Sequence, residues 1–124
     1  MRALVVDDSR AIRSVLRRML GEIGFGADEA GDGRQALALL ERIPAPDVML
    51  VDWNMPEMDG LALVQALRAV PDYDAIPVVM VTTESEVERV IQALEAGANE
   101  YLMKPFTKEG LLSKLELLGV AALA

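Results

Sequence analysis

The chain has 124 residues, of which 52% are hydrophobic and 26% charged, and this size and composition predict one domain with its own core. It has no cysteine and no histidine, which excludes disulfide frameworks, thiolate or imidazole metal sites and catalysis by either residue, so any chemistry must use carboxylates, hydroxyls and lysine. With 12 basic and 20 acidic residues the net charge is −8, which argues against nucleic acid or an anionic membrane as the main partner.

Short apolar runs alternate along the chain with longer segments whose apolar residues recur at helical spacing. The runs predict β-strands at residues 3–6, 26–30, 48–51, 77–81 and 99–103. The other segments predict α-helices around the apolar positions 12–23, 36–43, 61–67, 87–94 and 111–118. The chain therefore reads as five consecutive strand–helix units.

Residues at the segment boundaries support these helices. Side chains that commonly cap helix N-termini stand before the second, third and fifth helices, at Asp32, Asp59 and Thr107. Thr83 and Glu86 have the spacing of a capping box, and Gly97 follows the fourth helix as a C-terminal stop.

Strict alternation of strand and helix predicts an α/β fold, a doubly wound parallel sheet with right-handed crossovers and helices on both faces. The apolar runs 48–51 and 78–81 suit central strands, whereas 26–30, with two charges and a glycine, suits an edge strand. In such a sheet, ligands bind beyond the carboxyl ends of the strands.

Polar side chains stand at the carboxyl ends of four predicted strands. They are Asp7 and Asp8 after the first strand, Asp52 after the third, Thr82 after the fourth and Lys104 after the fifth. These ends share one rim of the sheet, so the three carboxylates approach one another and repel. Lys104 supplies one positive charge, and a hard divalent cation, most naturally Mg²⁺, would supply the rest.

This set of residues has the chemistry to hold a phosphoryl group. Asp52 would be the nucleophile, Thr82 would hydrogen-bond a phosphoryl oxygen, and Lys104 with Mg²⁺ would neutralise the developing charge. Each residue alone has an ordinary explanation: Asp8 or Ser9 as a helix cap, Thr82 as a β-branched strand residue, and Lys104 as a solvated loop charge. Capping does not predict the combination, so we favour the phosphoryl site.

Four sequence motifs closely resemble the receiver domain of two-component response regulators. They are VVDDS at 5–9, VDWNMP at 51–56 followed by DG at 59–60, VT at 81–82, and YLMKPF at 101–106. The resemblance spans essentially the whole chain, and DWNMP and KPFT are most like stand-alone chemotaxis (CheY-like) regulators. It implies that residues 1–124 form one receiver domain with a flavodoxin-like fold, five strands in the order 2-1-3-4-5 and five helices.

The resemblance also implies a mechanism. Asp52 would accept a phosphoryl group from a phosphohistidine of a sensor histidine kinase, with Mg²⁺ bound by Asp7, Asp8, Asp52 and the backbone carbonyl of Asn54. The chain would be a signalling switch rather than an enzyme, because it would catalyse only its own phosphorylation and dephosphorylation.

Further residues receive roles from the same resemblance. Thr82 would move toward the aspartyl phosphate and Tyr101 would turn inward, remodelling the face built from the fourth helix, the fifth strand and the fifth helix. From the residues alone, Tyr101 reads as a core aromatic with its hydroxyl at the surface. Asn54 and Glu84 would line the approach of the hydrolytic water and set the lifetime of the phosphorylated state.

Two positions depart from the family pattern. Thr83 stands where a smaller residue is common, which is expected to restrict access to the site. Gly110 lies in the first turn of the last helix, where glycine costs about 1 kcal/mol relative to alanine, so this helix is expected to be loose at its start.

The expected context is that of a cytoplasmic monomer. The apolar run at residues 3–6 is too short for a signal peptide or membrane span, and the tail 119–124 is too short for an effector domain. Expected partners are the sensor kinase and an output protein such as a flagellar motor switch component. Lys104, Lys108 and Lys114 lie near the output face, where they could meet an acidic peptide.

Three alternatives remain to be weighed. A phosphohydrolase of the haloacid-dehalogenase type uses a similar rim, but it needs a second aspartate where Asn54 stands, and room for a substrate cap. A degenerate receiver would act as an interaction module, yet the acids, hydroxyl and lysine are all present. The sequence GDGRQA at 31–36 matches a dinucleotide fingerprint, but it follows the polar edge strand, whose acids would face a pyrophosphate.

Overall fold

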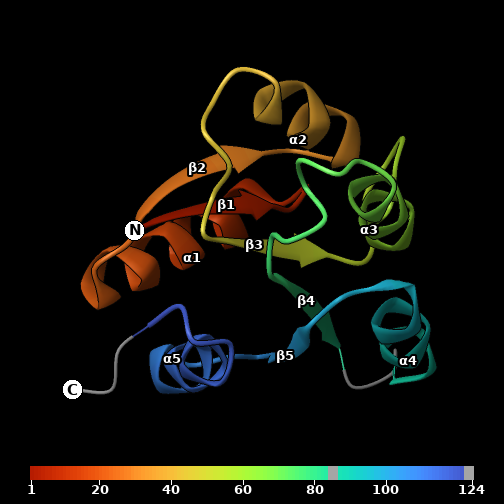
Figure 1. Ribbon diagram of the computed structural model, residues 1–124. Coiled ribbons are helices and arrows are strands. Elements are labelled where there is room, and N and C mark those ends of the chain that lie inside the picture. The colour runs from red at the N-terminus through yellow and green to blue at the C-terminus, as the bar shows by residue number, and fades with distance from the viewer. Residues whose placement is uncertain (84–86, 122–124) are drawn as a thin grey trace.

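The computed structural model describes residues 1–83 and 87–121 of the chain. Within these residues, five parallel strands form one sheet in the order β2-β1-β3-β4-β5, as predicted (Figure 1). The strands are β1 (Arg2–Val6), β2 (Gly26–Ala30), β3 (Val48–Asp52), β4 (Val78–Thr83) and β5 (Glu100–Lys104).

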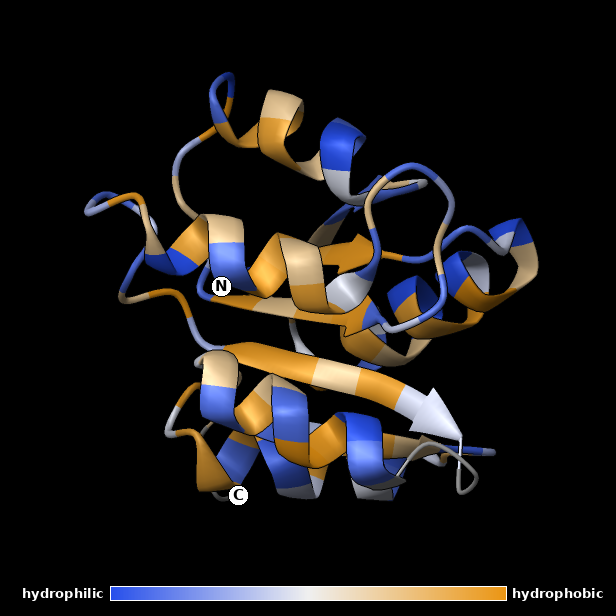
Figure 2. Cartoon of the chain, turned by 90° about the vertical axis from the view of Figure 1, so that its right-hand side faces the viewer, coloured by the Kyte–Doolittle hydropathy of each residue, from blue (hydrophilic) through white to orange (hydrophobic). Residues whose placement is uncertain are grey.

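Helices cover both faces of the sheet (Figure 1). They are α1 (Arg10–Ile23), α2 (Gly33–Leu40), α3 (Gly60–Arg68), α4 (Val87–Ala96) and α5 (Lys108–Leu117). Helices α1 and α5 pack on one face, and α2, α3 and α4 pack on the other. Hydrophobic residues concentrate along the strands and on the helix sides that face them (Figure 2). The interior therefore consists of two hydrophobic cores, one on each side of the sheet.

Several strands extend beyond the predicted apolar runs. β3 includes Asp52, β4 runs on to Thr83, and β5 runs from Glu100 to Lys104. Backbone pairing continues through these polar residues, since Asp52 pairs with Val81 and Thr83 pairs with Lys104. The polar residues of the rim are therefore held by the sheet itself.

Capping side chains begin helices α1, α2, α3 and α5. Ser9 accepts a hydrogen bond from the backbone of Ile12, and the predicted caps Asp32, Asp59 and Thr107 accept equivalent bonds from their own helices. Thr107 accepts from the backbone N–H of Gly110 at 3.0 Å, so α5 starts with a formed cap. The predicted capping box of Thr83 needs Glu86, which lies outside the described residues.

The edge position predicted for residues 26–30 is confirmed, and the charges of β2 are paired there. Asp28 forms an ion pair with Arg2 at 3.0 Å. Glu29 forms ion pairs with Arg13 at 2.8 Å and with Arg17 at 2.6 Å. The hydrogen bond from Arg13 is the main cause of the lowered pKa of Glu29.

Arg68, the last residue of α3, joins that helix to two loops. Its guanidinium donates hydrogen bonds of 2.8 to 3.1 Å to the backbone carbonyls of Tyr73, Asp74, Ile76 and Gly97 and to the side chain of Asn99. The end of α4 and the start of β4 are thereby tied to α3. No helix in the described part of the chain is both long and apolar enough to cross a membrane.

Candidate functional site

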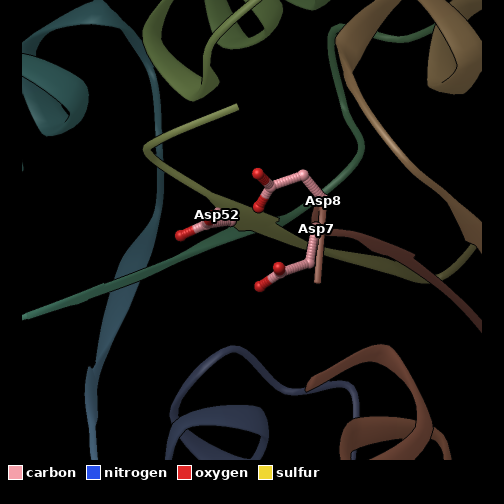
Figure 3. Close-up of side chains that lie close together, drawn as sticks. All are labelled: Asp7, Asp8 and Asp52. Atoms are coloured by element: carbon pink, nitrogen blue, oxygen red, sulfur yellow. The ribbon is translucent and has the colours of Figure 1, made fainter. Parts of the chain in front are cut away.

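Three carboxylates meet at the carboxyl ends of β1 and β3. Asp7 and Asp8 follow β1, and Asp52 ends β3; one carboxylate oxygen from each lies within 4.8 Å of the other two (Figure 3). The sheet brings them together because Val6 pairs with Val51, which places Asp7 beside Asp52. Asp7 and Asp52 are buried, whereas Asp8 is exposed.

Lys104 reaches this cluster from β5. Its Nζ lies 3.2 Å from Asp52 Oδ1, to which it donates a hydrogen bond, and 3.7 Å from Asp7 Oδ2. The register between β4 and β5 holds Lys104 beside Thr83, so the side chain must cross the end of β4 to reach the acids. The lysine thus supplies positive charge to both buried carboxylates.

The groups around Asp7 and Asp52 offset only part of the cost of burying two negative charges. Burial, followed by repulsion from Asp7, raises the pKa of Asp52 from its ordinary 3.8 to about 6, although Lys104 acts in the opposite direction. Burial also raises the pKa of Asp7, against a hydrogen bond from the backbone of Ser9. Asp7 Oδ2 is buried and receives no hydrogen bond from the residues that the structure describes.

This donor set fits a divalent cation. A hard cation prefers carboxylate and carbonyl oxygens, and it would satisfy the buried Asp7 oxygen and relieve the repulsion that raises the pKa of Asp52. Asp8, at the exposed side of the cluster, contributes a third carboxylate. The geometry therefore fits a site for a divalent cation.

Thr82 and Tyr101 lie on the two strands beyond β3. Thr82, one residue past the partner of Asp52, is buried in β4, and its hydroxyl donates a hydrogen bond of 3.4 Å to the carbonyl of Thr83. Tyr101, in β5, is half-buried, and Lys114 Nζ lies 4.2 Å from its ring centroid. Lys114 also forms an ion pair with Glu100 at 3.0 Å.

An apolar cavity of about 230 Å³ separates α4 from β5 beside Tyr101. It is lined by Thr83, Val90, Ile91, Leu94, Tyr101 and Met103. The ring of Tyr101 therefore borders space on the face that the family resemblance identifies as the output face. Glu84, the other residue expected to tune hydrolysis, lies outside the described residues.

Sequence reasoning missed Arg89, which contacts two residues of the loop after β3. Its Nη1 donates a hydrogen bond of 3.0 Å to Asn54 Oδ1, and its guanidinium carbon lies 5.7 Å from the ring centroid of Trp53. A pocket of about 520 Å³ beside the acid cluster is lined by Asp8, Trp53, Asn54, Met55, Pro56, Asp59 and Arg89. A single arginine on a predicted helix does not indicate these contacts in the sequence, because they depend on how α4 packs beside the loop after β3.

Arg13 was missed for the same reason. It extends from α1 and donates a hydrogen bond of 2.6 Å from Nη1 to the backbone carbonyl of Asp7, while its Nε binds Glu29. The loop that carries the first two acids is thus fixed from α1 and β2. A sequence pattern shows that Arg13 lies on a helix but not which carbonyl it reaches.

Known proteins similar to this chain belong to one family of signalling domains. The profile of the response regulator receiver domain matches residues 3–116. The chemotaxis protein CheY homolog of Campylobacter jejuni is 45% identical over 117 residues, covering 94% of this chain and 90% of that protein. The crystallised chemotaxis protein CheY4 of Vibrio cholerae, at low pH, has a TM-score of 0.86 and 38% identity, covering 94% of this chain and 96% of the other. A putative response regulator from Chloroflexus aurantiacus has a TM-score of 0.89 and 30% identity, covering 94% and 95%.

The match extends along nearly the full chain and includes the acid cluster, and it decides against one of the alternatives raised by the sequence. It supports a signalling protein rather than a phosphohydrolase that turns over a separate substrate. The chain belongs to the response regulator receiver family and is a CheY-like phosphorylation-dependent signalling switch.

Proposed function

We propose that Asp52 is the phosphoryl acceptor of this switch. The observation that carries the proposal is its position: a buried carboxylate beside Asp7 and Asp8, within hydrogen-bond distance of Lys104. In the reaction, an Asp52 oxygen forms a bond to phosphorus and the P–N bond of a phosphohistidine breaks, leaving its electron pair on the donor imidazole. Residues 1–124 contain no histidine, so the phosphohistidine that donates the group lies outside them.

Mg²⁺ is the proposed cofactor. Asp7, Asp8 and Asp52 would hold it with their carboxylates and Asn54 with its backbone carbonyl. The buried Oδ2 of Asp7, which receives no hydrogen bond from the described residues, supports this assignment. When bound, Mg²⁺ supplies positive charge against the negative charge of the transferring phosphoryl group.

The remaining residues act on the phosphorylated state. Lys104, already paired with Asp52, would transfer its ion pair to a phosphoryl oxygen, and the hydroxyl of Thr82 would donate a hydrogen bond to another. The movement of Thr82 toward the phosphoryl group would leave space for the ring of Tyr101 to turn inward, beside the cavity next to α4. The face formed by α4, β5 and α5 would change shape and select its partner.

Dephosphorylation returns the switch to its resting state. Water attacks phosphorus, the bond between phosphorus and the Asp52 oxygen breaks, and inorganic phosphate leaves as the carboxylate re-forms. Asn54 and Glu84 are the proposed residues that tune this rate.

The proposed partners follow from the family and from relatives named as chemotaxis proteins. A sensor histidine kinase would provide the phosphohistidine, and an output protein such as a flagellar motor switch component would bind the α4–β5–α5 face. We propose that residues 1–124 act as one receiver domain, monomeric and located in the cytoplasm, without direct contact to nucleic acid or membrane insertion.

The test is incubation with acetyl phosphate and Mg²⁺, followed by intact mass and Trp53 fluorescence. Wild type should gain the mass of one phosphoryl group and change its emission, because Trp53 adjoins Asp52. Asp52→Asn should gain no mass, whereas Asp72→Asn, which removes an exposed carboxylate elsewhere, should behave as wild type. Saturating Mg²⁺ that leaves the Trp53 signal of wild type unchanged would contradict the metal site.

Other outcomes identify the rival functions. Steady turnover of a phosphomonoester would indicate a phosphohydrolase. Failure of every phosphodonor to modify the wild-type protein would indicate an interaction module, and a phosphorylated Asp52→Asn variant would place the acceptor elsewhere.

A further inference from the structure

Arg89 bridges α4 and the loop that follows β3, at the mouth of the site. It is exposed on α4, yet its guanidinium hydrogen-bonds Asn54 and lies over the ring of Trp53. An exposed arginine is ordinarily mobile, because ordering its long side chain costs conformational entropy. Two partners on one loop hold this side chain in a single place.

The bridge also determines the orientation of the Asn54 amide. A guanidinium has only donors, so the atom of Asn54 that faces Arg89 must be the acceptor Oδ1. The amide N–H groups therefore face away from Arg89. Loss of the bridge removes the donor that faces Asn54 Oδ1 and so weakens the constraint on the orientation of this exposed amide.

The bridged residues line the open side of the acid cluster. Trp53, Asn54 and Arg89 all line the same pocket as Asp8. A water molecule that attacks a phosphoryl group on Asp52 must approach opposite the breaking bond, from solvent outside the buried strand end. The Arg89–Asn54 bridge belongs to the lining of the pocket beside the cluster and is therefore placed to narrow this approach.

We propose that Arg89 is a positioning residue that lengthens the life of the phosphorylated state by holding Asn54 across the mouth of the site. This inference rests on the proposed function of Asp52. Arg89 acts through Asn54 and does not itself contact the phosphoryl group. Loss of the bridge opens the approach for water and accelerates hydrolysis of the aspartyl phosphate.

The test is a double-mutant cycle on the full chain. Wild type, Arg89→Ala, Asn54→Ala and the double variant are phosphorylated with acetyl phosphate and Mg²⁺, the donor is removed, and release of inorganic phosphate is timed. Arg89→Ala should accelerate release by about threefold to tenfold, which lies in the lower part of the range of coupling between contacting side chains, as suits an exposed pair. In the Asn54→Ala background the same change should have an effect of less than about twofold.

Two further variants separate positioning from charge. Arg89→Lys keeps the charge and one donor but loses the planar group, so its rate should lie between those of wild type and Arg89→Ala. Arg18→Ala removes an exposed arginine from α1 and should leave the rate unchanged. The Trp53 emission of the unphosphorylated protein without Mg²⁺ should shift in Arg89→Ala and stay unshifted in Arg18→Ala.

The outcomes distinguish this inference from the function on which it rests. A wild-type protein that accepts no phosphoryl group refutes both. A phosphorylated wild type whose hydrolysis rate is unaffected by Arg89→Ala refutes the positioning role alone, as does an equal effect with and without the Asn54 amide. Slower hydrolysis in Arg89→Ala would overturn the stated direction.

Discussion

Replacing Asp52 with asparagine is expected to stabilise the metal-free protein at neutral pH. The substitution keeps the shape of the side chain and removes a negative charge that is buried beside Asp7. The pKa of Asp52 is raised from 3.8 to about 6. When the group is ionised in both the native and the unfolded state, this shift lowers the free energy of unfolding by about 3 kcal/mol. Residual solvent and relaxation of Lys104 reduce the expected gain to about 2 kcal/mol.

The pH dependence has a definite sign. Between pH 3.8 and about 6 the native state binds more protons at Asp52 than the unfolded chain does, so its contribution to stability falls as pH rises. The cost is absent below this window, because both states are protonated, and is fully present above it. The difference between Asp52→Asn and wild type should therefore be small near pH 4 and reach its full size by about pH 7.

Urea denaturation at several pH values measures this difference. Comparing the two proteins cancels the carboxylates that do not interact with Asp52, and Asp72→Asn serves as the control for loss of an exposed negative charge. Saturating Mg²⁺ should stabilise wild type and reduce the difference, because an ion that binds the native state shifts the unfolding equilibrium. A variant no more stable than wild type at pH 7 without Mg²⁺, or a gain that is equal at pH 4, would refute the reasoning.

Three further changes test other parts of the structure. Glu29→Gln should lower the free energy of unfolding by about 1 kcal/mol or less at pH values above 4.5, the ordinary pKa of this group. Urea denaturation should show this loss disappearing as the pH falls through the lowered pKa of Glu29. Arg68→Ala should lower the unfolding free energy by about 2 to 4 kcal/mol, because the backbone carbonyls that accept its hydrogen bonds lose their donor. A loss below about 1 kcal/mol would contradict the role of Arg68 in joining α3 to the two loops. Lys114→Met should shift the ring resonances of Tyr101 in NMR spectra, since the ammonium lies 4.2 Å from the ring centroid, and unchanged resonances would exclude that contact in solution.

The parallel direction of the strands was predictable because it follows from the alternation of short apolar runs with helical segments, whereas their order was predicted only from the resemblance to receiver domains. The edge strand was recognised from its charges, and the structure shows what these charges do: Asp28 and Glu29 pair with arginines of β1 and α1. Strand ends were less predictable, because hydrogen-bonded pairing continues through Asp52 and Thr83, whose polarity suggested a loop.

The meeting of the acids was also predictable, since parallel strands direct their carboxyl ends to one rim. Contacts between a helix and a loop were not. Arg89 meets Asn54 only because α4 packs beside the loop after β3, and a helical pattern carries no information on which loop lies next to it. Arg68 likewise reads as an ordinary C-terminal arginine until its carbonyl partners are seen.

The sheet separates two hydrophobic cores, and neighbouring residues of one strand belong to opposite ones: Leu4 and Val6 face α2, α3 and α4, whereas Ala3 and Val5 face α1 and α5. Side chains on one side of this wall can exchange places without changing the volume available on the other. We therefore expect a shift of α4 to be taken up mainly by the core between α4 and the sheet, while α1, through the hydrogen bond from Arg13 to the carbonyl of Asp7, keeps the first two acids in place. The outer surface would then change while these two acids stay aligned.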